Sequence, residues 1–395
     1  MSLHDACEAV IRQWHKYEVD RNGSVIIDYD CKPRSGEEAD PIASRLDVHR
    51  RLSELKSAAC AEQDLNLVER LTADLTYLEA LLGAQRSLED YLLCTQGCAA
   101  RGWSPDYVVS RGALARELLK DRDVSWGAQT LNELEHLEGA LSPVDAPSAI
   151  RAAAWELQPR LRDYSGVRAE PDIAIETVEV DDYWAYWLDG ASQKVRLRLN
   201  LKNAKFTTVR ARQFALHELL GHAIQYANLS LIANESHVEW FPLFSVHATN
   251  QVLFEGLAQA LPLFMISEDS DLAIRVRLDH YIQLVRAELH IALNEGSSIA
   301  SCVEHAHQRV PWWTNEDIAG ILSDRGINSP LLRTYLWAYP AGCDWFVNLA
   351  DQASPTFAQE VISAAYLAPL SPKQLEAKWP AGPPIGGGGR SVRLR

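Results

Sequence analysis

The chain of 395 residues is poor in basic residues, with 38 lysines and arginines against 53 aspartates and glutamates and a formal net charge of −15. Nucleic acids and anionic membranes attract basic surfaces, so this deficit disfavours both as partners. No uninterrupted apolar run approaches the roughly 18 residues that a membrane-spanning helix needs. The segment from Met1 to Glu8 also lacks the basic region and the apolar stretch of a secretory signal.

Cysteines are few and lack a pattern. There are seven of them, an odd number without a repeated spacing, which argues against a disulfide framework. Cys94 and Cys98 lie four positions apart, but two small core residues explain them better than a metal or redox pair. A hydrophobic content of 47% is enough for a sizeable core. We therefore expect a globular cytoplasmic protein with reduced thiols.

Leucine spacing predicts a mostly α-helical protein of the α+β class. Leucines recur at intervals of three and four among charged residues in 46–61 and 65–94, as in amphipathic helices that pack on one another. Residues 1–165 are accordingly predicted to form a helical N-terminal region. A metal-binding catalytic region of 166–379 would follow it, and the Gly- and Pro-rich segment 380–395 is predicted to be a flexible tail. Within the second region we expect further helices at 271–295, 315–324 and 330–351.

Strand patterns are confined to 171–201. Strands are expected at 173–175, 183–188 and 195–201, the last with strict alternation of apolar and polar residues, and Asp189-Gly190 would form the turn between the last two. We therefore predict a small antiparallel sheet just before the metal-binding helix. Arg196 and Arg198 face away from its apolar side, where a solvated role is favoured over contact with a substrate carboxylate.

The most informative motif is His217-Glu218-Leu219-Leu220-Gly221-His222, in which two histidines bracket a glutamate within an apolar helical stretch. Residues five positions apart in a regular helix point about 140° away from each other. A π-type turn, with hydrogen bonds from i to i+5, would return both imidazoles to one face, and such turns occur mostly at functional sites. Gly221 lies where this distortion is expected. The spacing thus predicts a π turn at a metal site.

A third ligand is expected downstream. Glu255 lies in a second apolar stretch, where an unpaired carboxylate would be costly to bury and a metal ion would satisfy it. Three rival ligands lie closer to His222 in the sequence: Glu235, His237 and Glu239. Their segment is rich in Ser, Asn and Glu, which is typical of a solvated loop. Glu255 is therefore the preferred third ligand.

These residues carry a family resemblance. The HExxxH motif, followed by Glu255-Gly256-Leu257-Ala258, resembles zinc metallopeptidases with HExxxH and EGLA motifs, the group that includes the tubulin tyrosine carboxypeptidases. It is also similar to bacterial peptidase-like proteins with an EGWA motif, and both groups belong with the gluzincins. The resemblance spans about residues 170–350. It implies that His217, His222 and Glu255 hold one zinc ion and that Glu218 is the general base.

The chemistry of the residues agrees with that resemblance. Three protein ligands leave a fourth position for a water molecule, whose pKa falls toward 7. Glu218 is placed to take its proton and deliver it to a leaving amine. Tyr335 and Tyr339 are candidate oxyanion donors, since related families carry a tyrosine-containing segment here, and His290 is a further candidate. His247 and His280 are expected to be structural.

The sequence therefore predicts a zinc-dependent hydrolase that cleaves an amide or peptide bond, and the family resemblance favours carboxypeptidase-like action. Its partner would be a peptide or a small amide substrate. Three alternatives remain: a metalloenzyme acting on a small natural product by hydrolysis or by iron or manganese chemistry, an inactive peptide-binding protein on the same scaffold, and a helical interaction protein without metal.

Overall fold

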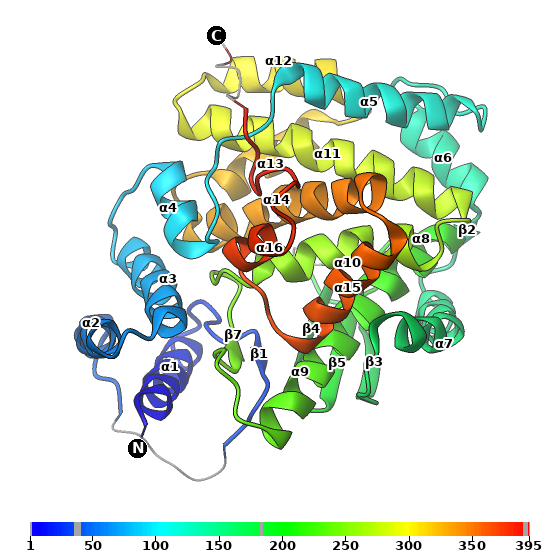
Figure 1. Ribbon diagram of the computed structural model, residues 1–395. Coiled ribbons are helices and arrows are strands. Elements are labelled where there is room, and N and C mark those ends of the chain that lie inside the picture. Colours follow the sequence, from blue (N-terminus) through cyan, green and yellow to red (C-terminus); the bar gives the residue numbers. More distant parts are fainter. Residues whose placement is uncertain (1, 35–40, 182–184, 390–393, 395) are drawn as a thin grey trace.

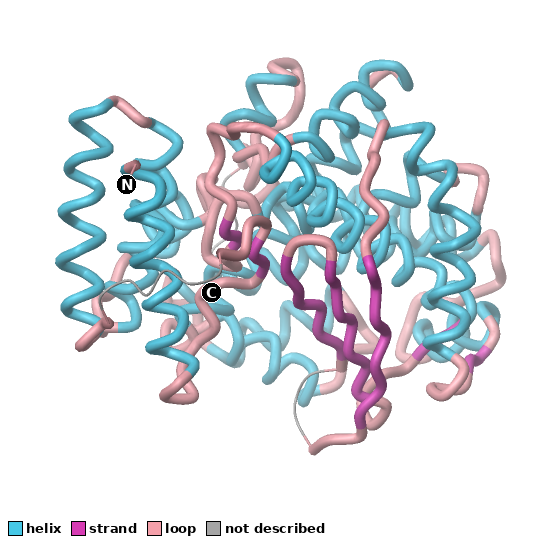
Figure 2. The backbone as a smooth tube through the Cα atoms, turned by 90° about the horizontal axis from the view of Figure 1, so that it is seen from below, coloured by secondary structure: helices cyan, strands magenta, loops and turns pink. Residues whose placement is uncertain are grey.

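The computed structural model describes residues 2–34, 41–181, 185–389 and 394. These residues form a mostly helical molecule with a small mixed sheet, which confirms the predicted α+β class (Figure 1). Figure 2, seen from below, shows the strands of the larger sheet in the middle of the view with helices on both sides. Within the described residues, no helix is both long enough and apolar enough to cross a lipid bilayer.

The first three helices, α1 (Leu3–Val19), α2 (Arg45–Glu62) and α3 (Leu65–Leu81), share a small hydrophobic core of their own. The helix predicted over 65–94 is in fact two helices, because α3 ends before Gly83, whose φ of 96° a helix cannot accommodate. Ser87 then caps α4 (Leu88–Thr95).

Helices α4 to α7 belong to the main core and not to that of α1–α3. The remaining members are α5 (Pro105–Lys120), α6 (Thr130–Glu138) and α7 (Ala146–Ser165), and their apolar faces pack against the C-terminal half of the chain. The boundary between separate cores thus falls after α3, well before the predicted region boundary at residue 165.

The sheet differs from the antiparallel sheet that the sequence predicts. Its order is β3-β5-β4-β1-β7, with β3 (Asp172–Val178) parallel to β5 (Lys194–Asn200) and β4 (Tyr186–Ala191) antiparallel to it. The sheet is mixed because β5 pairs in parallel with β3 on one side and antiparallel with β4 on the other. Two short strands from outside 171–201 join it, β1 (Tyr29–Asp30) and β7 (Leu243–Phe244), and two residues are too few to show alternation.

The hairpin turn between β4 and β5 also lies further along than predicted. Asp189-Gly190 belongs to β4, and the chain reverses at Ser192, whose φ is 54°. Of the strand predicted at 183–188, residues 183 and 184 lie outside the described residues. A separate pair, β2 (Ala140–Leu141) and β6 (Phe206–Thr207), is antiparallel and leads into the motif helix.

The motif helix and two long helices form the centre of the molecule. α8 (Thr208–Phe214), capped by Thr207, continues through the π-helix η1 (Ala215–Ala223) into α9 (Ile224–Glu235). α10 (Gln251–Met265) is buried between η1 and α14 (Pro330–Gln352). The elements around them are α11 (Ser270–Asn294), α12 (Ile299–Arg309), α13 (Asn315–Arg325), α15 (Pro355–Leu367) and α16 (Pro372–Lys378).

The prediction of a flexible tail is wrong for residues 382–389. Ile385 is 4% exposed, and the backbone of Gly102 exchanges hydrogen bonds with that of Gly386 (2.9 Å) and Gly389 (3.1 Å). Gly386 and Gly387 have positive φ angles, and a Cβ on either would collide with backbone carbonyls of the facing segment. The glycines therefore permit close packing here instead of disorder. Residues 390–393 and 395 lie outside the described residues.

Candidate metal centre

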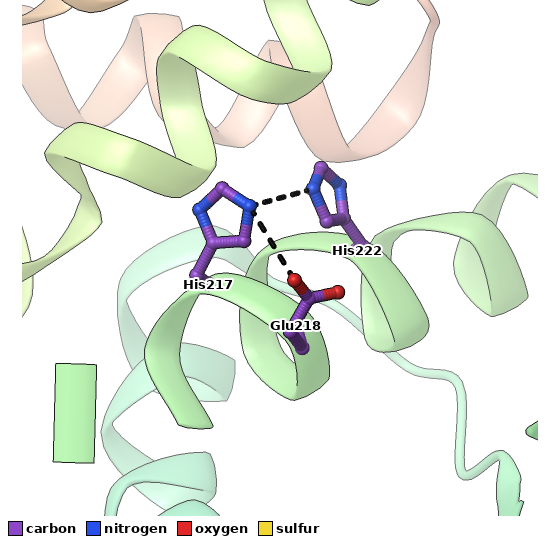
Figure 3. Close-up of side chains that lie close together, drawn as sticks. All are labelled: His217, Glu218 and His222. Atoms are coloured by element: carbon purple, nitrogen blue, oxygen red, sulfur yellow. Dashed lines mark hydrogen bonds and ion pairs between the residues drawn. The ribbon is translucent and has the colours of Figure 1, made fainter. Parts of the chain in front are cut away.

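The π-helix η1 brings the two motif histidines to the same face. It spans Ala215–Ala223, which confirms the predicted π turn, and it places His217 Nε2 and His222 Nε2 3.2 Å apart (Figure 3). Gly221 serves close packing in this turn, because a Cβ there would lie 2.8 Å from Ala258 Cβ on α10. The backbone irregularity and the glycine together hold the histidines against α10.

Glu255 on α10 completes a triangle with the two histidines. Its Oε2 lies 3.5 Å from His217 Nε2 and 3.6 Å from His222 Nε2. Ligand atoms about 2.0–2.1 Å from a tetrahedral zinc ion lie about 3.4 Å from one another. The three separations in the protein, 3.2, 3.5 and 3.6 Å, have this size. The three atoms are therefore spaced like three corners of a zinc coordination tetrahedron.

Glu218 lies at the same cluster in a different position. His217, Glu218 and His222 have potential ligand atoms within 4.8 Å of one another. The Glu218 Oε1 atom, however, is 3.7 Å from His217 Nε2, and no ion pair joins it to His222 (Figure 3). In contrast, Glu255 Oε2 is nearly equidistant from both histidines. Glu255, and not Glu218, therefore lies at the third corner of the triangle, and Glu218 lies beside it.

Burial separates the two carboxyl groups electrostatically. Burial, together with the charges of Glu255 and Asp28, raises the pKa of Glu218 to about 7 against the lowering effect of His217. Burial also raises the pKa of Glu255, but the nearby His222 and His217 outweigh it and hold that pKa well below its usual range. Glu255 is therefore the permanent anion, while Glu218 exchanges a proton near neutral pH.

Glu255 Oε2 fits a metal ion for a further reason. This atom is buried and has no hydrogen-bond donor among the described residues, although buried carboxylate oxygens are normally satisfied. Tyr335 on α14 donates a hydrogen bond of 2.6 Å to the other oxygen, Oε1. One carboxylate oxygen is thus anchored by protein, while the other faces the histidines and is free to bind a cation.

The two predicted tyrosines both lie at the site, one helical turn apart on α14. The hydroxyl groups of Tyr335 and Tyr339 are 2.8 Å apart. Burial, with the charge of Glu255, raises the pKa of both phenols well above 10, so both remain protonated hydrogen-bond donors. Because Tyr335 donates its only hydroxyl hydrogen to Glu255, Tyr339 is the donor in the bond between the two tyrosines, and it can serve a substrate by turning that hydrogen away from Tyr335.

The triangle faces a cavity of about 300 Å³ whose lining is mainly apolar. Three of its polar lining residues were not predicted: Asp28, Tyr186 and Tyr226. Tyr226 stacks on His222, with ring centroids 5.6 Å apart, and its spacing of four residues from that histidine is a signal that sequence inspection could have used. Asp28 and Tyr186 come from a loop and a strand far from the motif, and nothing in the sequence marks them.

Burial, with the charges of Glu255 and Asp189, raises the pKa of Asp28 to about 7. Within the described part of the chain, neither a lysine nor an arginine lines this cavity.

The structure does not bring His290 to the site. It is 1% exposed and packs edge-on against the Trp337 ring, at 5.8 Å between centroids, outside the lining of the cavity. Neither ring nitrogen has a hydrogen-bond partner in the described structure, and burial lowers its pKa well below 6.5. The helix that carries it, α11, passes the site, but His290 lies too far along it to serve as an oxyanion donor.

The remaining polar candidates lie elsewhere. His247 and His280 are buried and bond to Asp74 and Asp344, at 2.8 Å each, as expected for structural histidines. The rival ligands Glu235, His237 and Glu239 lie at or beyond the end of α9 and do not line the cavity. Arg196 and Arg198 pair with Asp189 on the neighbouring strand.

Comparison with known proteins adds information on the fold alone. No protein-family model and no curated protein matches the chain. A solved structure from Colwellia psychrerythraea, described as a "putative lipoprotein", is similar, with a TM-score of 0.51 at 14% identity. The similarity covers 76% of this chain and 54% of that one, so this chain spans about half the length of that structure.

Proposed function

We propose that the protein is a zinc-dependent hydrolase that cleaves an amide or peptide bond. The proposal rests above all on the triangle of His217 Nε2, His222 Nε2 and Glu255 Oε2, whose sides of 3.2 to 3.6 Å match tetrahedral zinc. Two histidines and one carboxylate are the ligand set of many catalytic zinc sites, which keep one position open for water or substrate.

A bound zinc ion would supply Lewis acidity and a water molecule acidic enough to lose its proton at neutral pH. Glu218 would accept that proton on a carboxylate whose pKa of about 7 suits transfer in both directions, and would then deliver it to the leaving amine. Tyr339 would donate its phenolic hydrogen to the oxygen on which negative charge develops. Tyr335 would hold Glu255 in its ligating orientation.

An extended peptide suits the wall formed by β4. Tyr186, Trp187 and Leu188 line the cavity, and the neighbouring strand β1 meets β4 only at Gly190 and Ala191. Within the described residues, the backbone edge of β4 beside the site is therefore open on the side away from β5. Such an edge can pair with the backbone of a substrate.

The first experiment measures bound metal by mass spectrometry after zinc repletion and desalting. We expect near-stoichiometric zinc in the wild type and none in His217→Ala or Glu255→Ala. The matched control is His49→Ala. His49 lies on α2, away from the site, and pairs with Glu79 of α3. The proposed zinc site would be overturned if the wild type contained no zinc, or if both ligand variants retained it.

Turnover is tested separately with Glu218→Gln. Removing a general base costs about 10²–10⁴-fold in rate, while the zinc content should stay at the wild-type level. A peptide library digested by the wild type and left intact by this variant supports the hydrolase. A zinc-loaded wild type that cleaves none of the library and binds its peptides would favour the inactive peptide-binding protein instead.

We also propose a cytoplasmic location. All seven cysteines are unpaired in the structure, as is usual in a reducing compartment. Fractionation of cells that express the full-length protein, probed with an antibody, tests this location, and recovery in the membrane fraction would contradict it.

A further inference from the structure

A second cavity lies on the far side of Tyr339 from the metal centre. Its volume is about 460 Å³, and Tyr186 and Tyr339 line both this cavity and the one that faces the triangle. A smaller hollow between them is lined by His217 and Glu218 as well as by Arg210, which also lines the second cavity. The second cavity therefore adjoins the metal centre, with the smaller hollow lined by residues of both.

Arginines dominate the polar lining of this second cavity, despite the net charge of −15 on the whole chain. There are four of them: Arg210, Arg275, Arg286 and Arg325. Arg275 is neutralised by Glu138 through two hydrogen bonds of 2.7 Å. Within the described structure, the other three form no ion pair.

Two of the unpaired arginines are held in unfavourable surroundings. Arg325 is 4% exposed, and its one hydrogen bond described here goes to the carbonyl oxygen of Ile321. Nε of Arg286 is buried without an acceptor, and the guanidinium lies over the Trp313 ring at 5.9 Å. Burial, together with the positive charge of Arg286, lowers the pKa of Arg325 to about 9.

Both arginines therefore remain charged at neutral pH and repel each other. Such an arrangement is costly, because buried charges are normally paired. An anion between them would supply the missing acceptors and offset the repulsion. Guanidinium groups bind carboxylates and phosphates through paired, charge-assisted hydrogen bonds, which suits either anion.

The charge balance of the cavity favours a carboxylate over a phosphate. Besides the four arginines, the lining carries Asp279 and Asp317. With Arg275 neutralised by Glu138 and two further charges offset by the aspartates, one positive charge remains, which matches a single carboxylate. The side chains of Trp312 and Trp313 add an apolar wall for the carbon chain that bears it.

We propose that Arg286 and Arg325 bind a carboxylate group in this cavity, next to the metal centre. The inference rests on the proposed function only in taking this carboxylate to be part of the substrate. A chain terminus and an acidic side chain would offer the same chemistry, and the choice of probes distinguishes them.

Three matched probes test the carboxylate by calorimetry. Benzoyl-Gly-Gln carries a terminal carboxylate, benzoyl-Gly-Glu-amide carries a side-chain carboxylate, and benzoyl-Gly-Gln-amide carries neither. We expect at least one of the two acids to bind the wild type about tenfold or more tightly than the neutral amide. Arg286→Gln and Arg325→Gln should each lose this preference, while Arg101→Gln, on an exposed surface arginine, should keep it.

Equal binding of all three probes to the wild type, or a preference that survives in both arginine variants, would overturn the proposal. So would inorganic phosphate that displaces the acids at lower concentration than acetate does. The preference should persist in His217→Ala, because the cavity does not require the metal. A wild type that binds no zinc after repletion but keeps the preference would therefore reject the hydrolase and leave this site standing.

A stability measurement guards against misfolding of the variants. Removing one of two buried like charges should leave the urea midpoint of Arg325→Gln equal to or above that of the wild type. Arg275→Gln, which breaks the pair with Glu138 in the same cavity, should lower it. A midpoint of Arg325→Gln that falls as far as that of Arg275→Gln would show that Arg325 supports the fold and would overturn its role as an anion ligand.

Discussion

Replacing Gly342 by alanine should separate the two helices that hold the site. Gly342 on α14 meets Gly256 on α10, and a Cβ at residue 342 would lie 2.7 Å from Gly256 Cα and against the Val252 carbonyl oxygen. Carbon atoms pack best at about 3.5–4.0 Å. Relief of the clash therefore requires the helices to move apart by about 1 Å, and α14 would carry Tyr335 away from Glu255.

The expected cost combines three contributions. Overpacking of this kind costs about 1–3 kcal/mol. Loss of the 2.6 Å hydrogen bond from Tyr335 to the buried Glu255 carboxylate costs about 1.5–3 kcal/mol. The helix propensity of alanine returns about 1 kcal/mol. We expect the free energy of unfolding of Gly342→Ala to fall by about 1.5–5 kcal/mol.

Urea denaturation with linear extrapolation measures this change. The matched control is Gly320→Ala in α13, where a Cβ would meet nothing within 4 Å, so the free energy of unfolding should rise by about 0.5–1 kcal/mol. If the two variants have the same stability, Gly342 is not a point of close helix contact, and the reasoning fails.

Three further predictions concern buried hydrogen-bonded groups. Tyr335→Phe leaves Glu255 without its anchoring donor and should weaken zinc binding about 10–100-fold in competition with a chelator; unchanged affinity would contradict that role. Glu138→Gln breaks a pair with Arg275 in which both side chains are 2% exposed, and should cost about 3–5 kcal/mol in urea denaturation; a loss under about 1 kcal/mol would show that the pair is dispensable. Burial raises the pKa of Asp74, but its arginine and histidine partners outweigh burial and lower that pKa below 3.8. The ionised group therefore stabilises the native state above pH 3.8, and this contribution is lost as the pH falls through the folded pKa. When the free energy of unfolding is measured against pH, Asp74→Asn should lack this part of its decline in acid.

The local features of the site follow from the sequence. In a regular helix, the five-residue spacing would keep His217 and His222 from sharing one face. The π turn that this spacing predicts is present. The apolar setting of Glu255 marks it as a carboxylate in need of a partner, and it lies within 3.6 Å of both histidines. The caps at Thr207 and Thr314 are equally local, because each side chain accepts a hydrogen bond from the backbone N–H three residues further along.

Other features could not be predicted because they depend on segments distant in the sequence. His290 and Tyr339 both belong to apolar helical patterns. His290 of α11 nevertheless lies in the core, whereas Tyr339 of α14 lines the cavity, because packing decides which residues of each helix reach the site. Asp28 reaches the cavity only because β1 inserts between β4 and β7. The Gly- and Pro-rich segment near residue 386 has the composition of a mobile tail, and it packs because a matching backbone surface exists near Gly102.

The sequence by itself therefore determined the helical class, the π turn, the histidine pair and the carboxylate beside it, because each depends on side chains within a few turns of one segment. The tertiary structure alone decided that Tyr335, and not Tyr339, bonds to Glu255, and that Asp28 and Tyr186 line the cavity. It also decided that Arg286 and Arg325 line the same cavity, where neither forms an ion pair with a described residue. These outcomes are set by how α10, α11, α13 and α14 pack, and the free energy of that packing is a sum over contacts between residues far apart along the chain.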